Sequence, residues 1–247
     1  MIACDCDVCH STDPRDRRSR PSIFIETDAG ARLLVDTTPD LRTQALTHGL
    51  RGVDAVLLTH AHADHVMGLD DVRRFNVVSR TPLPIYAQAD TLEEVRTTFR
   101  YAFASRAPKG GGVPDLRLCP LGGGAFCLGG QEIVPIPVDH GPWSVLGFRL
   151  GPVAYLTDCN AIPESSLARL TNLDTLILDA LRHKPHPTHF SVSEALVMAK
   201  RIGARQTYFT HIAHDLGHAA TCAALPPGVT LAYDGLMLTF PAPAGAA

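Results

Sequence analysis

The segment LLTHAHADHVMGLDD, residues 57–71, concentrates four metal-ligand side chains within six positions: His60, His62, Asp64 and His65. It follows directly from VDAVLLT (53–59), a continuous apolar run with β-branched residues that predicts a strand buried on both faces. On extended backbone, residues two apart point to the same side, so His60 and His62 can bind one ion together. Where the chain turns into a helix, the other two side chains point elsewhere and can reach a second ion.

A pair of ions needs more imidazole and carboxylate ligands than one segment supplies. Three further candidates each follow a predicted strand: His140 in PVDHGP, Asp158 in AYLTDC and His211 in TYFTH. Each alone could be an ordinary turn residue. Because they share one placement, at the sheet edge where active sites of layered folds gather, we expect them to join the first four in one metal centre.

The N-terminal segment CDCDVC contains Cys4, Cys6 and Cys9, a density of thiols typical of a structural zinc site. Such a site normally has four ligands, and His214 in THIAH is the candidate for the fourth. A Cys3His site would tie the irregular N-terminus to the rim of the metal centre. The alternative is a cysteine-rich terminus that binds nothing.

The chain has 247 residues, of which 45% are hydrophobic, and this predicts one domain over 1–247 with residues 1–20 as an irregular zinc-binding segment. A net charge of -3 argues against nucleic acid or a membrane as a partner. No stretch has the length of a bilayer span or the core of a signal peptide, so we expect a cytoplasmic protein. A homodimer is compatible with the sequence, which does not decide the oligomeric state.

The remaining pattern predicts an α/β fold in which strands and helices alternate and then strands dominate. The stretch 105–115 is rich in glycine and proline and predicts a loop. Ser191 and Glu194 form a capping-box pattern at the start of a helix. Helices are predicted at 37–49, 64–78, 90–103, 163–171 and from 191, and strands at 22–27, 31–36, 53–59, 83–88, 116–121, 125–140, 143–150, 152–160, 173–181, 206–211 and 229–235.

The HxHxDH motif at 60–65, followed in order by His140, Asp158 and His211, resembles the signature of the metallo-β-lactamase superfamily. The resemblance covers nearly the whole chain. It implies an αββα four-layer sandwich with a dinuclear centre between the edges of two sheets. It also implies the ligand sets: His60, His62 and His140 for one ion, Asp64, His65 and His211 for the other, and Asp158 as the bridge. Zinc and manganese both suit such ligands.

The N-terminal cysteines and THIAH (210–214) resemble one branch of that superfamily, the phosphoribosyl 1,2-cyclic phosphate phosphodiesterases of the carbon–phosphorus lyase pathway. In that branch a histidine ahead of the penultimate helix serves in catalysis, and His189 in PTHFSVSEAL is its match. A helix N-terminus favours anions, and histidine titrates near neutrality, which suits proton donation. This branch usually begins with a strand and a glycine-rich turn ahead of the cysteines, whereas this sequence starts almost directly at Cys4. We therefore expect either a fold without the usual first strand or a native chain that starts upstream of Met1.

The resulting hypothesis is a phosphodiesterase that opens a small cyclic phosphodiester by attack of a metal-bound hydroxide, with two divalent ions (Zn or Mn) and one structural zinc. Its predicted catalytic residues are Asp64 and His189, and its partner is a small phosphorylated substrate. A tRNA-processing nuclease or a thioester hydrolase of the same fold is the alternative. From a different class, a non-catalytic metal-binding protein is the remote alternative, which metal-dependent turnover would exclude.

Overall fold

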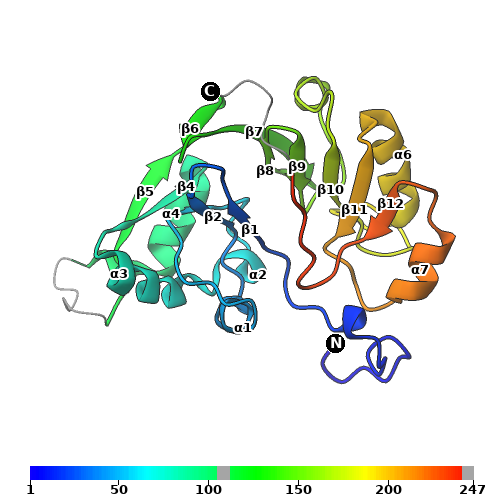
Figure 1. Cartoon of the computed structure of the whole chain (residues 1–247), viewed down its shortest axis with the longest axis horizontal. Helices are drawn as coiled ribbons and strands as arrows, with labels where there is room; N and C mark the ends of the chain where they lie inside the picture. The colour runs from blue at the N-terminus through cyan, green and yellow to red at the C-terminus, as the bar shows by residue number, and fades with distance from the viewer. Residues whose placement is uncertain (105–111, 241–247) are drawn as a thin grey trace.

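The computed structural model describes residues 1–104 and 112–240 and contains two β-sheets that face each other, with helices on their outer surfaces (Figure 1). This confirms the predicted αββα sandwich. Residues 105–111 of the predicted loop lie outside the described residues. Within the described residues the first strand is β1, so no strand precedes the cysteines. None of the helices in this part of the chain has the length and apolar character of a membrane span.

The first sheet has the strand order β1-β2-β3-β4-β5. β1 and β2 form the predicted hairpin, and β2 to β5 run parallel to one another. Parallel strands place their carboxyl ends at one edge of the sheet, where ligand sites of open α/β sheets form. The strands are β1 (Ile23–Glu26), β2 (Arg32–Val35), β3 (Ala55–Leu57), β4 (Leu83–Ala87) and β5 (Leu116–Pro120).

The second sheet has the strand order β12-β11-β10-β9-β8-β7-β6. Strands β9 to β12 are parallel, whereas β6, β7 and β8 form antiparallel hairpins joined to β9. The strands are β6 (Phe126–Leu128), β7 (Gln131–His140), β8 (Trp143–Leu150), β9 (Val153–Leu156), β10 (Thr175–Asp179), β11 (Gln206–Thr210) and β12 (Val229–Leu231).

Alternating side chains of the strands build the layers of the sandwich. In β2, Leu33 and Val35 pack toward the second sheet, where they meet Phe148 and Tyr155. Leu34, between them, packs with Val56 against the helices of the first half. This two-residue period, with both faces apolar, explains why the strands are continuous apolar runs. A third cluster packs α6 against the second sheet.

The helices lie on the outer faces of the sheets, α1 to α4 on the first half and α6 and α7 on the second (Figure 1). Ser191 and Glu194 form both bonds of the predicted capping box at the start of α6. The helices are α1 (Leu41–Thr47), α2 (Ala63–Val66), α3 (Arg73–Ser79), α4 (Ala89–Thr98), α5 (Glu164–Leu167), α6 (Val192–Ile202) and α7 (His218–Ala224), with 3-10 turns η1 (Pro14–Asp16), η2 (Leu69–Val72) and η3 (Arg100–Phe103).

The helix predicted over 64–78 is divided into α2, η2 and α3. Its backbone is diverted to a neighbouring segment: the Gly68 amide donates to the Thr37 carbonyl at 2.9 Å, and the Thr37 amide donates to the His65 carbonyl at 2.8 Å. In a continuous helix, the Gly68 amide and the His65 carbonyl would form hydrogen bonds within the helix. Helix α7 was not predicted at all, because it is short and begins at Gly217, which has no side chain for capping.

Candidate metal centre

The predicted ligands come from the ends of strands in both sheets. His60, His62, Asp64 and His65 follow β3, and His140 is the last residue of β7. Asp158 follows β9, and His211 follows β11. The two sheets are joined at this edge, because the Leu146 amide donates to the Thr59 carbonyl at 3.0 Å. The centre therefore lies where the ends of both sheets meet.

Potential ligand atoms form two adjoining groups, within each of which all atoms lie within 4.8 Å of one another. One group contains His60, His62, His140 and Asp158, and the other contains Asp64, His65 and His211. The structure thus brings together all seven residues that the sequence predicted for the dinuclear centre. Asp158 is grouped with His60, His62 and His140, and it forms a further group with His189 and His211.

Asp158 lies between the two groups and presents one carboxylate oxygen to each. Its Oδ2 lies 3.7 Å from Nε2 of His60. Its Oδ1 lies 3.2 Å from Nε2 of His65 and 3.4 Å from Nε2 of His211. A carboxylate with its oxygens divided in this way has the geometry that a bridge between two ions requires.

Several of the histidines are oriented by hydrogen bonds at Nδ1, which leave Nε2 for the centre. Asp36 Oδ2 lies 2.7 Å from Nδ1 of His65, in a site with no exposed surface. The Thr188 carbonyl accepts from Nδ1 of His140 at 2.8 Å. Such partners fix the ring orientation and the tautomer of a metal-binding histidine.

The buried polar atoms at this site fit metal ions. Among the described residues, Nε2 of His60, Nε2 of His65 and both ring nitrogens of His211 are buried without a hydrogen-bond partner. Buried polar atoms in proteins are ordinarily satisfied, so unpaired nitrogens that converge on two carboxylates indicate absent ligands. Nitrogen and carboxylate oxygen are donors that zinc and manganese accept.

Strained backbone accompanies the site. Asp36, Asp158 and His211 have positive φ angles of 64°, 51° and 55°, although none of them is glycine. Such conformations are uncommon for side-chain-bearing residues and cluster at functional sites, where the surrounding structure enforces them. All three follow the carboxyl ends of strands, and the turn directs each side chain into the centre.

The electrostatics of the site balance imidazoles against carboxylates. Burial, with the neighbouring histidines, lowers the pKa of His60 to about 2, so its ring is neutral and able to bind a cation. Burial also disfavours charge on His65, but Asp36 and Asp158 raise the pKa of that ring well above its ordinary value. The His211 ring, whose Nε2 lies 3.6 Å from Oδ2 of Asp64, lowers the pKa of this carboxyl, which is therefore ionised. The ionised carboxylates that lie among these imidazoles attract divalent cations.

His189 lies beside the centre, and its ring stacks on that of His211 with centroids 4.7 Å apart. Nδ1 of His189 lies 2.9 Å from Oδ2 of Asp179, a fully buried carboxylate that also accepts the Cys159 amide. Because Nδ1 is engaged by Asp179, Nε2 is left for a substrate or an ion, and His189 forms a further group of potential ligands with Asp158 and His211. His186 lies next to His189, whereas His183 belongs to none of these groups.

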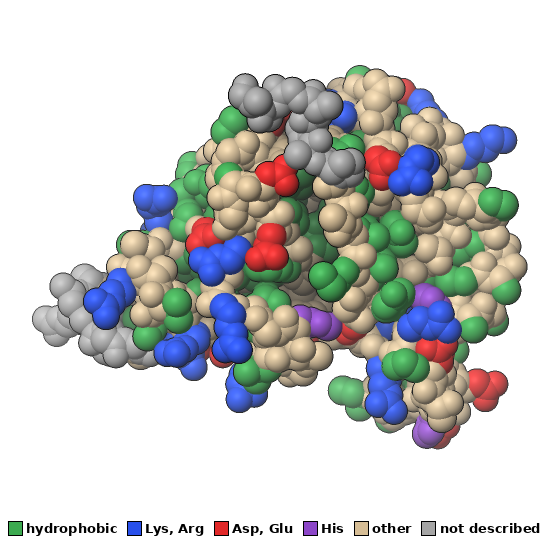
Figure 2. Space-filling view, viewed as in Figure 1, with side chains coloured by type: hydrophobic (Ala, Val, Ile, Leu, Met, Phe, Trp, Pro, Cys, Tyr) green, Lys and Arg blue, Asp and Glu red, His purple; other side chains and the backbone are tan. Residues whose placement is uncertain are grey.

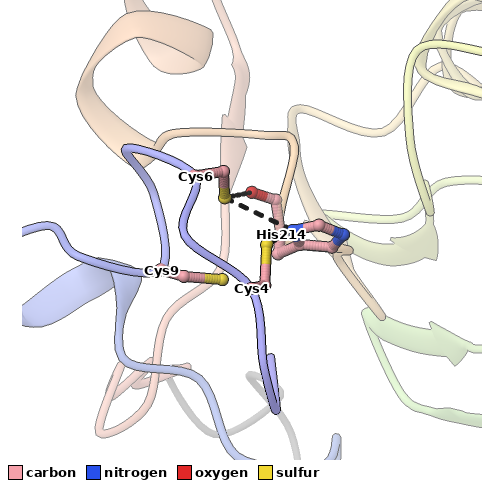
Figure 3. Close-up of side chains that lie close together, drawn as sticks. All are labelled: Cys4, Cys6, Cys9 and His214. Atoms are coloured by element: carbon pink, nitrogen blue, oxygen red, sulfur yellow. Dashed lines mark hydrogen bonds between the residues drawn. The ribbon is translucent and has the colours of Figure 1, made fainter.

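The N-terminal cysteines converge on His214, as Figure 3 shows. Nδ1 of His214 lies 3.3 Å from the sulfur of Cys4 and 3.4 Å from the sulfur of Cys6. The potential ligand atoms of Cys4, Cys6, Cys9 and His214 all lie within 4.8 Å of one another. The contact with His214 lowers the pKa of the Cys6 thiol to about 6, which favours the thiolate that a zinc ion binds. The arrangement suits a four-ligand site.

Sequence reasoning missed four residues at the centre: Asp36, Asp179, Arg20 and Trp143. Asp36 directly precedes the helix predicted at 37–49, a position typical of a helix cap, but it contacts His65 and Thr59 instead. Nη1 of Arg20 lies 3.8 Å from Oδ2 of Asp64. Figure 2 shows a hollow between the two halves of the molecule, with acidic and basic side chains beside it. Asp36 and Asp179 each end a strand or follow one, a placement that could have indicated them.

The two-sheet sandwich, with histidines and aspartates converging at its strand ends, is that of a hydrolase with the metallo-β-lactamase fold. Residues 31–212 match the family described as the beta-lactamase superfamily domain, and the chain belongs to this family. The predicted membership in the superfamily is confirmed.

One solved structure, described as a new diphosphatase from the PhnP family, is 44% identical to the chain with a TM-score of 0.90, over 97% of this chain and 92% of that one. Ribonuclease Z of Mycobacterium bovis is 30% identical, over 83% of each chain. A protein of Porphyromonas gingivalis named octanoyltransferase is 37% identical over 95% of this chain. The chain spans only 48% of that protein's length.

Proposed function

We propose that this hydrolase is a phosphodiesterase that opens a small cyclic phosphodiester, with phosphoribosyl 1,2-cyclic phosphate as the first candidate substrate. The observation that carries the proposal is Asp158, which presents one oxygen to each of two complete ligand groups beside His189. Two ions spaced for a phosphate suit displacement at phosphorus. The resemblance to the PhnP-family diphosphatase supports phosphorus chemistry over thioester or lactam chemistry.

One ion would be held by His60, His62 and His140. The other would be held by Asp64, His65 and His211, and Asp158 would bind both ions. When bound, such ions polarise a phosphoryl oxygen and lower the pKa of water so that a nucleophile is available near neutral pH. The protein keeps the ligands in place before substrate arrives, through Asp36 on His65 and the Thr188 carbonyl on His140. Pre-organised charge of this kind costs no rearrangement during the reaction.

His189 would donate a proton from Nε2 to the leaving oxygen. Its Nδ1 bond to Asp179 fixes the ring, and it stacks beside His211 at the edge of the ligand groups. A proton at this place neutralises the alkoxide as the phosphorus–oxygen bond breaks, a contribution of about 10²- to 10⁴-fold in many enzymes. Because Nε2 is also within reach of Asp158 and His211, the role of a further metal ligand is the alternative.

A diphosphate is the second candidate substrate, because the 44% identical structure is described as a diphosphatase. Hydrolysis of a diphosphate breaks a phosphorus–oxygen bond by the same displacement, so the same residues would serve. A third, structural zinc would be held by Cys4, Cys6, Cys9 and His214. The net charge of -3 favours a small phosphorylated molecule over nucleic acid as the partner.

The decisive experiment measures turnover of phosphoribosyl 1,2-cyclic phosphate, a nucleoside diphosphate sugar and bis(p-nitrophenyl) phosphate by protein loaded with Zn²⁺ or Mn²⁺. A His189→Ala variant is measured beside the wild type, and its metal content is determined. We expect opening of the cyclic phosphate, a loss of at least 100-fold in kcat for the variant, and unchanged metal at the centre.

Loss of metal from the His189→Ala variant would show that His189 is a metal ligand instead of a proton donor. Turnover of the diphosphate without the cyclic substrate would select the second candidate. Cleavage of precursor tRNA or of a thioester, with no phosphodiester hydrolysed, would replace the proposal by the nuclease or the thioester hydrolase. No turnover of any of these by protein with its metals bound would indicate a binding protein.

A further inference from the structure

Trp143, the chain's single tryptophan, lies beside two candidate ligands of the metal centre, His62 and His140. It begins β8 and pairs in register with His140, the last residue of β7, so the hairpin that supplies a ligand also positions the indole. The indole is perpendicular to the ring of His62, with centroids 5.6 Å apart, and lies 6.1 Å from the ring of His140. Two candidate ligands therefore support it.

Trp143 remains 55% exposed although it is the largest side chain near the centre. His62 is also exposed, whereas His60, His65 and Asp158 are buried. The open side of the centre is thus the side of His62 and Trp143, and a substrate that reaches the buried ligands passes the indole.

Single exposed hydrophobic residues are common on protein surfaces and need no function. Trp143 differs because it is fixed against two rings of the centre, and because one wall of the entrance is an aromatic surface. Indole faces stack on nucleobases, and this interaction is the usual basis for binding bases without hydrogen-bond readout. A sugar phosphate without a base has no comparable group to place there.

We infer that Trp143 stacks on the base of a nucleotide, so that the preferred substrate of this centre is a nucleoside-linked phosphodiester or diphosphate. The inference rests on the proposed hydrolysis of a phosphorus–oxygen bond, and it favours a substrate that carries a nucleobase over phosphoribosyl 1,2-cyclic phosphate, which has none. The phosphorus lies at the His and Asp ligands, and the base lies outward on the indole. Arg20 lies beside Asp64, on the other ligand group, and supplies a positive charge there for a further phosphate.

The fluorescence of the single tryptophan tests this contact without requiring turnover. Zn²⁺-loaded protein is titrated with adenosine 5′-monophosphate, ribose 5-phosphate and phenyl phosphate. We expect saturable quenching by the nucleotide and little change with ribose 5-phosphate. Quenching by phenyl phosphate without quenching by the nucleotide would show an aryl site and overturn the assignment to nucleosides.

Calorimetry of the same ligands with Trp143→Ala and Trp143→Phe supplies the second measurement, after equal zinc content has been established. We expect the alanine variant to bind the nucleotide about tenfold more weakly, equivalent to about 1.4 kcal/mol, and ribose 5-phosphate as the wild type does. Phenylalanine, which keeps a stacking face against His62, should restore part of the difference. Equal weakening for both ligands would mean that the indole only supports the metal ligands, and would overturn the inference.

Failure of the inference and failure of the proposed function give different results. If the protein hydrolyses phosphodiesters but shows neither quenching nor a selective loss of nucleotide affinity in Trp143→Ala, the proposed function stands and the role of Trp143 is refuted. Protein that binds the nucleotide through Trp143 but hydrolyses no phosphorus–oxygen bond keeps the binding site and refutes the function.

Discussion

At the scale of single residues, the centre depends on side chains that orient the candidate ligands but are not ligands themselves. Asp36 is fully buried and contacts both Thr59 and His65. Its charge and its position fix Nε2 of His65 toward Asp158. A carboxylate of this kind raises the basicity of the imidazole and holds its tautomer, and its loss commonly costs about 10- to 100-fold in metal affinity or activity.

We therefore predict that Asp36→Asn lowers the metal affinity of the second ligand group by about 10- to 100-fold, since an amide is a weaker acceptor and carries no charge. Metal content after dialysis against graded chelator measures the change. Asp28→Asn, at an exposed hairpin turn, is the matched control and should match the wild type. Full metal retention by Asp36→Asn would show that Asp36 does not contribute to metal binding.

Arg20 is a second residue whose effect can be predicted. Its side chain is 59% exposed, and its Nη1 lies 3.8 Å from Oδ2 of Asp64, a candidate metal ligand. We predict that Arg20→Ala raises KM about two- to fivefold for a substrate with an additional phosphate, with kcat retained, because an exposed ion pair contributes up to about 1 kcal/mol. Arg17→Ala, exposed on the same segment, should change neither constant. A fall in kcat alone would contradict this role.

Sequence reasoning predicted the candidate ligands that the fold brings together, but not the residues that orient them, for a physical reason. HxHxDH at 60–65 is dense, and its spacing itself suggests metal binding. Asp36, Asp179 and Arg20 are isolated in the sequence, and they reach the centre only through contacts of the folded chain with His65, His189 and Asp64, respectively. Asp36 adjoins Thr37 and Pro39, which made a helix cap the simpler interpretation. The fold, not the local pattern, decides such contacts.

At the scale of elements, the strands were predicted better than the helix after β3. Apolar runs identify strands that are buried on both faces, since each side chain position is apolar. The division of 64–78 into α2, η2 and α3 depends on Gly68, which lies against the backbone of another segment. A Cβ at Gly68 would lie 2.0 Å from the Thr38 carbonyl oxygen. Glycine there is a requirement of packing that the local sequence does not reveal.

Substitution of Gly68 tests this close approach. We predict that Gly68→Ala lowers the free energy of unfolding by about 1–3 kcal/mol, because the backbone of 37–41 must move away from η2. Gly122→Ala is the matched control, since a Cβ there meets nothing within 4 Å and the backbone needs no positive φ. Urea denaturation of both variants measures the difference. Equal stability of the two would show that the segments separate without cost.

At the scale of the whole molecule, the N-terminal segment lies against the second half, below β11 and α7 (Figure 1). Besides the cysteines at His214, Arg18 donates to the carbonyls of Ala213 and Leu216, and the His218 amide donates to Asp16. The sequence predicted the link to His214 from ligand type alone. It could not predict the hydrogen bonds around it, which depend on the path of the chain between 211 and 218.

These contacts join the first twenty residues to the segment that follows His211, so the cysteine cluster and the metal centre share one segment of the chain. We predict that Cys6→Ser removes one zinc per chain, leaves the ions of the His/Asp centre, and lowers the melting temperature by about 4–8 °C, equivalent to about 2 kcal/mol for a chain of this size. Cys127→Ser, at an exposed cysteine outside every candidate ligand group, is the matched control. Inductively coupled plasma mass spectrometry gives the metal content, and limited proteolysis should then cut first within residues 1–20. Unchanged zinc and unchanged stability in Cys6→Ser would mean that the thiols bind no metal, and that the hydrogen bonds of Arg18 and Asp16 alone hold the segment.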